Sequence, residues 1–173
     1  SIQSGELTQE EVDLAVRQLK NGKAPGLDGL PPEFWKLPKV KKSLLKFCIE
    51  TFHGNRPNEW GISGLTAIPT KGELRNTDNY RGIALMCVIM KVYNKMLLNR
   101  IRPHIEKHLR KNQNGFRTGR STVPQILALR RILEGVKDKN LPAMLTFVDF
   151  KKAFDSINRP TMFAILSAYV LPD

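Results

Sequence analysis

The sequence predicts an α+β fold that is mostly helical, with one β-hairpin and one buried strand. Apolar residues recur every three or four positions along most of the chain, which is typical of helices. Two short β-prone runs on either side of a polar loop predict the hairpin. Residues 144–148, MLTFV, are too uniformly apolar for a strand with one wet face, so we expect a strand covered on both sides.

Size and charge set the first limits on function. The 173 residues, 41% of them hydrophobic, can bury one substantial core. The formal charge is +12, and the window Lys91–Arg131 holds eleven basic residues and one acid, Glu106, so it carries +10 of this charge. Concentrated positive charge indicates a polyanionic partner. A solvated helix face would give the same pattern.

The two cysteines and the absence of long apolar runs indicate the compartment. Cys48 and Cys87 lie among apolar helical residues, so we expect buried thiols of a reducing compartment and no disulfide. No run is long enough to span a bilayer, and no signal peptide is recognisable. The sequence predicts a soluble intracellular protein of the nucleus and cytoplasm, with no membrane partner.

Two amphipathic helices are predicted in the first third of the chain. The first, Thr8–Gly22, begins with a capping box in which Thr8 and Glu11 satisfy each other's backbone N–H groups. The second, Lys41–His53, ends at Gly54. We expect one apolar face of each helix to be buried.

The glycine- and proline-rich loop between these helices, residues 21–32, places Lys23 and Asp28 in a tight exposed turn. It is only superficially similar to a phosphate-binding loop. A Walker motif requires Ser or Thr directly after its lysine, whereas Ala24 and Pro25 follow Lys23. ATP binding by a Walker loop is therefore excluded here.

The predicted hairpin consists of strands Leu65–Pro69 and Arg81–Leu85, joined by a polar loop. Lys71 follows the end of the first strand, and Arg81 begins the second. An ammonium and a guanidinium would then lie near one another, which suits a triphosphate. Two unrelated surface cations would have the same spacing.

A third helix, Leu85–Arg102, is predicted at the start of the basic window, with Pro103 marking its end or a kink. His104 and His108 follow four residues apart. A metal site would need further ligands, and the neighbouring sequence supplies no acidic or cysteine ligand that suits it. The spacing of the two histidines alone therefore does not predict a metal centre.

The segment Gln113–Thr122, QNGFRTGRST, predicts a glycine-bearing loop that opens onto a fourth helix near Ser121. Arg117 and Arg120 beside a helix start make a natural anion site. The expected inner face of this helix consists of Thr122, Ile126, Leu129, Leu133 and Val136.

Asp149 stands where the predicted buried strand ends and Lys151 and Lys152 return the chain to solvent. A strand-end carboxylate is a common ligand of Mg²⁺ held against a phosphate. A cap of the following turn is the alternative for a lone aspartate. A phosphatase-like nucleophile is a third hypothesis, but that class needs an acid two residues later, where Lys151 stands.

Four blocks resemble, in the same order, the N-terminal half of the reverse transcriptases of non-LTR retrotransposons. They are GKAPGLDGLPPEFWK (22–36), IPTKGELRNTDNYRGIAL (68–85), QNGFRTGRST (113–122) and FVDFKKAFDSI (147–157). The resemblance implies a partial right-hand polymerase, with the N-terminal extension and fingers in residues 1–142 and the start of the palm in 143–173. It also implies an RNA-directed DNA polymerase that extends a DNA primer on an RNA template.

The last block carries the chemistry that the resemblance implies. Asp149 corresponds to a ligand of both catalytic Mg²⁺ ions, and Phe150 offers its backbone carbonyl to one of them. Phe154 corresponds to the bulky residue under the incoming sugar, where a ring would clash with a 2′-hydroxyl and so select deoxynucleotides. A core aromatic is the alternative, and packing would keep the ring rigid in either role.

The other blocks imply contacts with nucleotide and template. Arg81 resembles the arginine that grips the incoming dNTP, with Lys71 as a weaker candidate for its partner. The template-side residues implied by the resemblance are Gln113, Gly115, Phe116 and Arg117, together with Lys23 and Asp28 near the point where the template enters.

The family's second acidic motif, an aromatic-Ala-Asp-Asp hairpin, is not found in these residues, nor are the primer grip and thumb. One carboxylate cannot hold two divalent ions, so we expect a fragment or a decayed copy that does not polymerise by itself. Its uncovered palm strand is expected to self-associate. The alternative function is a non-catalytic, basic nucleic-acid-binding module built on residues 91–131.

Overall fold

The computed structural model describes residues 4–70, 72–150 and 152–169. Its contacts divide the chain into two compact units, one that ends at Arg100 and one that begins at Ile101. The functional boundary expected after residue 142 does not coincide with this division and stays a prediction. Within the described ranges, no helix is both long and apolar enough to cross a membrane.

The first unit begins with α1 (Gln9–Arg17), whose predicted capping box is present. The Glu11 N–H donates to Thr8 Oγ1 at 3.3 Å, and the Thr8 N–H donates to Glu11 Oε2 at 2.9 Å. The helix ends at Arg17, before Gly22, which is where the sequence predicted its end. The Leu19 carbonyl accepts a hydrogen bond from Lys36 Nζ at 2.9 Å, so the chain leaves the helix without an unsatisfied group there.

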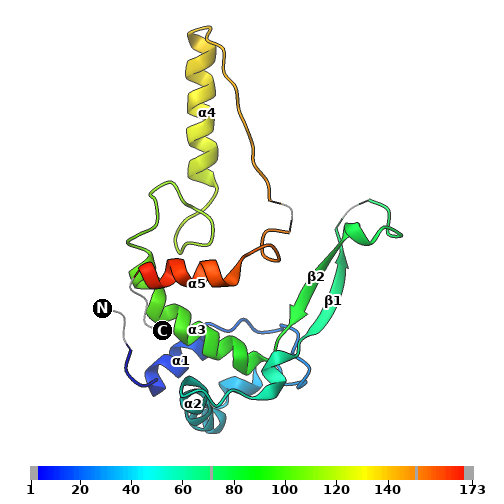
Figure 1. Cartoon of the computed structure of the whole chain (residues 1–173), viewed down its shortest axis with the longest axis vertical. Helices are drawn as coiled ribbons and strands as arrows, with labels where there is room; N and C mark the ends of the chain where they lie inside the picture. Colours follow the sequence, from blue (N-terminus) through cyan, green and yellow to red (C-terminus); the bar gives the residue numbers. More distant parts are fainter. Residues whose placement is uncertain (1–3, 71, 151, 170–173) are drawn as a thin grey trace. The chain divides into compact units, whose positions relative to one another are not determined.

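The core of the first unit lies between α1, α2 (Pro38–Phe52) and the part of α3 (Val88–Ile105) that belongs to this unit (Figure 1). The short 3₁₀ helices η1 (Phe34–Lys36) and η2 (Asn58–Gly61) each insert a tryptophan into it. The buried apolar residues are Leu7, Val12, Ala15, Val16, Trp35, Leu44, Cys48, Trp60, Val88, Ile89, Val92 and Met96. The predicted helices are thus confirmed with shifted ends.

Both cysteines are free thiols, as the sequence predicts. Cys48 is fully buried in the core, and burial raises the pKa of its thiol to about 12. Cys87 is partly buried at the start of α3. Cys48 therefore acts as a small apolar core residue.

The predicted hairpin is confirmed as β1 (Gly64–Pro69) paired antiparallel with β2 (Tyr80–Leu85). Its register runs from Gly64 opposite Leu85 to Pro69 opposite Tyr80. The connecting loop contains η3 (Thr77–Asn79). Its N-cap is Asn76, whose side chain accepts from the Asp78 N–H at 2.9 Å. Lys71 lies outside the described residues.

Gly26 fixes the loop between α1 and α2 against the start of α3. A Cβ added at Gly26 would lie 2.5 Å from the Cys87 backbone nitrogen and 2.8 Å from the Met86 carbonyl carbon. Backbone cannot yield as a flexible side chain can, so only glycine permits this approach. The glycine-rich loop is therefore packed closely at the base of the hairpin.

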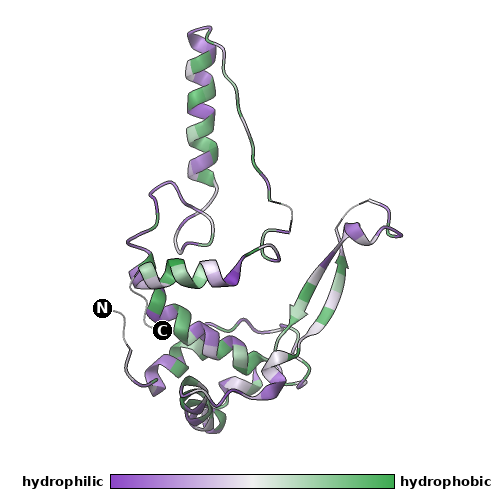
Figure 2. Ribbon diagram, viewed as in Figure 1, coloured by the Kyte–Doolittle hydropathy of each residue, from purple (hydrophilic) through white to green (hydrophobic). Residues whose placement is uncertain are grey.

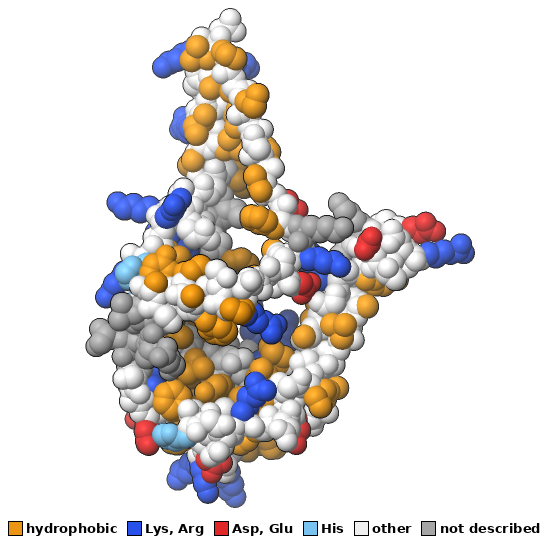
Figure 3. Space-filling view, viewed as in Figure 1, with side chains coloured by type: hydrophobic (Ala, Val, Ile, Leu, Met, Phe, Trp, Pro, Cys, Tyr) orange, Lys and Arg blue, Asp and Glu red, His pale blue; other side chains and the backbone are white. Residues whose placement is uncertain are grey.

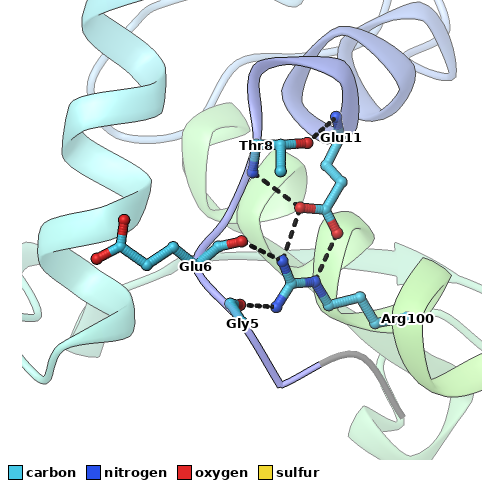
Figure 4. Close-up of polar contacts among 5 residues, drawn as sticks. All are labelled: Gly5, Glu6, Thr8, Glu11 and Arg100. Carbon is cyan, nitrogen blue, oxygen red and sulfur yellow. Dashed lines mark hydrogen bonds and ion pairs between the residues drawn. The ribbon is translucent and has the colours of Figure 1, made fainter. Parts of the chain in front are cut away.

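Arg100, at the end of this unit, holds the N-terminal segment (Figure 4). Its Nε and Nη2 donate to the two carboxylate oxygens of Glu11 at 2.5 and 2.8 Å, and its Nη1 and Nη2 donate to the carbonyls of Gly5 and Glu6 at 2.6 and 2.7 Å. The side chains of Arg100 and Glu11 are only 5% and 19% exposed. The hydrogen bond from Arg100 is the main reason that the pKa of Glu11 is lowered.

The second unit holds the end of α3, then α4 (Val123–Asp138) and α5 (Arg159–Ala168). Pro103 lies inside the last turn of α3, two residues before the helix ends. The predicted inner face of α4 is not buried. No residue of this helix is buried, and Ile126 and Leu133 are exposed. Figure 2 shows apolar and polar residues alternating along α4, so the helix is amphipathic without a covered apolar face.

The predicted buried strand is wrong for this structure. Residues 141–150 are extended, have no strand pairing and are all exposed, with Met144 at 91%. Figure 3 shows hydrophobic side chains at the surface along α4 and the segment after it. A strand needs a neighbour for its N–H and C=O groups, and the two strands within the described residues pair only with each other. The apolar composition therefore indicated a strand for which the described residues supply no partner.

We predict that Gly26→Ala destabilises the first unit by about 1–3 kcal/mol, because the new methyl group would overlap backbone atoms. Urea unfolding followed by circular dichroism measures this. Gly5→Ala is the matched control, since a Cβ there meets nothing within 4 Å. Equal midpoints for both variants would show that the close packing against Cys87 is wrong.

We predict that the Glu11–Arg100 pair makes stability fall in acid. Because the folded state lowers the pKa of Glu11, this stabilisation is complete above the unfolded-state pKa of about 4.3 and is lost as pH falls through the lower folded-state pKa. Glu11→Gln should cost about 2 kcal/mol at pH 7 and flatten the dependence of the urea midpoint below pH 5.

The control for this acid dependence is Glu10→Gln. It removes an exposed carboxylate of the same helix that makes no hydrogen bond or ion pair with the rest of the described chain. This variant should keep the wild-type acid dependence. If Glu11→Gln also keeps it, the ion pair does not contribute to folding stability.

Candidate functional site

Asp149 lies in the second unit, at the end of the extended segment, and is exposed. No hydrogen bond or ion pair joins it to other described residues, and Lys151 lies outside them. The neighbouring Phe150 is also exposed. Asp149 is thus accessible to a ligand from outside this unit.

The described residues do not by themselves fit a metal centre. Among them, no three His, Cys, Asp or Glu side chains lie close enough to hold an ion. Water and substrate phosphates can supply several of the six oxygen ligands of Mg²⁺, but a single exposed carboxylate with one backbone carbonyl cannot hold a pair of such ions. A two-metal site at Asp149 would need at least one further carboxylate.

Arg117 organises the loop between α3 and α4. Its Nε donates to Glu106 Oε1 at 2.8 Å, and its Nη2 donates to the same oxygen. Its Nη1 donates to the carbonyls of Arg110 and Gln113 at 2.8 and 3.0 Å. The Arg117 side chain is only 6% exposed, and its hydrogen bond is the main cause of the lowered pKa of Glu106. This arginine shapes the loop and leaves little of its guanidinium for a ligand.

Two further contacts hold the loop at its ends. Arg102 Nη1 donates to Thr118 Oγ1, which joins the loop to the end of α3. Gln125 Nε2 donates to the Asn112 carbonyl at 2.9 Å, which joins it to the first turn of α4. The loop is therefore a braced structure and not a free connection.

Phe116, in this loop, meets Phe154 from the turn that follows Asp149. The ring centroids are 6.1 Å apart and the planes are inclined by 85°, an edge-to-face contact. Phe116 has a positive φ of 61°, which is uncommon for a residue with a side chain. The structure thus brings together two residues that the sequence assigned to different roles.

The two histidines contact the C-terminal end of α5. His104 Nε2 lies 2.9 Å from the Tyr169 carbonyl oxygen, so this nitrogen donates. The His108 ring lies 5.1 Å from the Tyr169 ring and 5.3 Å from the His104 ring. Both histidines therefore connect the end of α3 with α5 in this unit.

Three other predicted residues belong to the first unit. Arg81 is exposed on β2, opposite Ile68 of β1. Asp28 Oδ1 accepts from the Leu30 N–H at 3.3 Å, which is a local turn contact, while Lys23 is exposed. The positions predicted for nucleotide and template contacts are therefore accessible on this unit.

Two arginines of the basic window have structural roles that the sequence did not predict. Arg100 and Arg117 are each committed to an acid, Glu11 and Glu106, and to backbone carbonyls. Glu106 carried a usable signal, because it is the single acid among eleven bases in its window. The partnership of Arg100 with a residue 89 positions away carried none.

Comparison with known proteins supports the resemblance found in the sequence. Residues 68–173 match the family described as "Reverse transcriptase (RNA-dependent DNA polymerase)". A putative 115 kDa protein in a type-1 retrotransposable element of Drosophila melanogaster is 35% identical, covering 85% of this chain and 15% of its own length.

Two other relatives match over most of this chain. The RNA-directed DNA polymerase from the mobile element jockey of Drosophila melanogaster is 28% identical, over 92% of this chain and 18% of its own length. An uncharacterized 149 kDa protein of the transposon TX1 from Xenopus laevis is 26% identical, over 94% of this chain and 13% of its own length. The chain spans less than a fifth of each of these relatives. From the matched family and these retrotransposon relatives, the chain belongs to the reverse transcriptase family, in the branch of the non-LTR retrotransposons.

Proposed function

We propose that this chain is part of an RNA-directed DNA polymerase that extends a DNA primer on an RNA template. The family match over residues 68–173 carries the proposal, because it includes Asp149 and Phe154 in the pattern D-x-x-x-A-F. A relative named as an RNA-directed DNA polymerase, from the element jockey, supports it. The exposure of Asp149 also leaves its carboxylate available to a ligand.

We propose that Asp149 is a ligand of both catalytic Mg²⁺ ions in the complete polymerase, and that the Phe150 carbonyl is a ligand of one of them. Further carboxylates would have to come from outside the described residues, because these alone do not fit the site. The apolar segment before Asp149 would then pair as a palm strand with strands from the same outside region. By itself, the chain is proposed to be inactive.

We propose that the remaining site residues bind nucleotide and template. Arg81, with Lys71, would hold the triphosphate of the dNTP, and Phe154 would lie under its sugar. Gln113, Gly115 and Phe116 would line the template side, where Arg117 shapes the loop through Glu106. Lys23 and Asp28 would lie where the template enters.

Binding of RNA without catalysis is a second candidate function. It is favoured by the cations of the basic window that stay exposed, apart from Arg100 and Arg117. Lys107, Arg110 and Lys111 are exposed just after α3. Arg130 and Arg131 are exposed on α4, with Glu134 as an ion-pair partner at 3.0 and 3.5 Å. Surface pairs of this kind are weak and leave the guanidinium accessible to phosphate.

We predict that Asp149→Asn abolishes DNA synthesis in the polymerase that contains this chain. Loss of the metal ligand removes several kcal/mol of charge stabilisation, so activity should fall below about 1% of wild type, while RNA affinity stays unchanged. Primer extension on an RNA template with Mg²⁺ and dNTPs measures the first, and filter binding the second.

Asp138→Asn, at the exposed end of α4, is the control and should polymerise normally. Undiminished synthesis by Asp149→Asn would refute the ligand role. If the unsubstituted polymerase binds RNA and makes no DNA, the basic nucleic-acid-binding module becomes the better hypothesis.

We predict that the 173-residue chain binds single-stranded RNA in a salt-dependent manner through Lys107, Arg110 and Lys111. Replacing all three with Ala removes up to three phosphate contacts. The negative slope of log affinity against log salt should then become shallower by about two. Fluorescence anisotropy across a salt series measures the slope.

The matched control replaces three exposed lysines of α2, Lys39, Lys42 and Lys46, which removes the same charge from another surface. The slope should then stay close to that of the wild type. Equal losses from both triple variants would show that only net charge matters and that the cations after α3 form no specific surface.

A further inference from the structure

Phe154 is not packed into a core in this unit. Its side chain is 74% exposed, and the single ring contact that the described residues give it is the edge-to-face contact with Phe116. A residue that excludes a 2′-hydroxyl by its bulk must hold its ring in one place, and side chains are held by what they pack against. Phe116 therefore supplies the support that a core would otherwise give.

Phe116 is in turn held by its backbone. Its ring is 91% exposed, so packing around the ring does not fix it. Its backbone has a φ of 61°, and the next residue is Arg117, whose guanidinium is bonded to Glu106 and to the carbonyls of Arg110 and Gln113. Three anchors on one planar group define the path of the loop at this point.

We propose that Phe116 is a positioning residue for sugar selection, acting by holding the Phe154 ring against the place of the incoming sugar. This rests on the proposed function, in which Phe154 lies under that sugar. An edge-to-face aromatic pair favours the packed position of a ring over its unpacked positions by a factor of about two to ten. Without Phe116, the Phe154 ring swings away for part of the time and a ribose 2′-hydroxyl is admitted.

The proposal links two parts of the site. The loop that carries Phe116 is also the loop proposed to lie on the template side, so a displaced template loop would relax the choice of sugar. Glu106 acts one step further away, because it fixes Arg117 and through it the backbone at Phe116. The Glu106–Arg117 ion pair and the Phe116–Phe154 contact thus connect the end of α3 with the proposed position of the nucleotide.

The test measures kcat/KM for a dNTP and for the matching rNTP in the polymerase that contains the full chain. Phe116→Ala should lower the dNTP-to-rNTP ratio of kcat/KM about two- to tenfold. Any loss of template contact affects both nucleotides alike and cancels in this ratio. Phe116→Tyr keeps the aromatic edge and should keep the ratio. Phe163→Ala removes an equally large exposed ring from α5 and should also leave the ratio unchanged.

Phe154→Ala separates failure of this inference from failure of the proposed function. If Phe154→Ala lowers the ratio and Phe116→Ala does not, Phe116 has no positioning role and the proposed function stands. If Phe154→Ala leaves the ratio unchanged, the sugar-contact role of Phe154 fails and the inference fails with it.

A double variant tests whether the two rings act together. In a Phe154→Ala background, Phe116→Ala should cause no further loss, because the ring that it positions is already gone. Two independent, multiplying losses would overturn the proposal. If Phe116→Ala does not fold, Phe116→Leu keeps an apolar side chain without the aromatic edge and should show the same lowered ratio.

Discussion

The ion pair between Arg100 and Glu11 is the interaction on which the first unit depends. It joins residues 89 positions apart, and the same guanidinium holds the carbonyls of Gly5 and Glu6. With both side chains largely out of water, loss of either partner leaves a poorly solvated charge. The pair fixes α1 beside α3, and α3 in turn carries much of the core face and follows directly from the hairpin.

The second unit uses the same chemistry on a smaller scale. Arg117 binds one carboxylate and two carbonyls, as Arg100 does, and converts a glycine-bearing segment into a defined loop. The cations of the basic window therefore fall into two groups. Some hold the fold, and others, such as Lys107 and Lys111, are exposed at the surface, where we propose that RNA binds.

The apolar segment before Asp149 shows that a strand needs pairing partners beyond the local sequence. Its side chains are suited to a covered strand, yet residues 141–150 are unpaired and exposed in this chain. A lone extended segment leaves its backbone groups to water, as on an unpaired sheet edge, and buries little of its apolar side chains. The same segment delivers the carboxylate proposed to bind metal, so completion of the sheet and completion of the site would be one event.

The sequence by itself determined the local features: the capping box at Thr8, the two strands of the hairpin, and the apolar face of α1. These follow from residue spacing and turn chemistry within a few positions. Only the tertiary structure decided that Gly26 must be glycine, that Arg100 and Arg117 are structural, and that Phe154 rests on Phe116. Such contacts join distant residues, and their energy depends on geometry that no local pattern records.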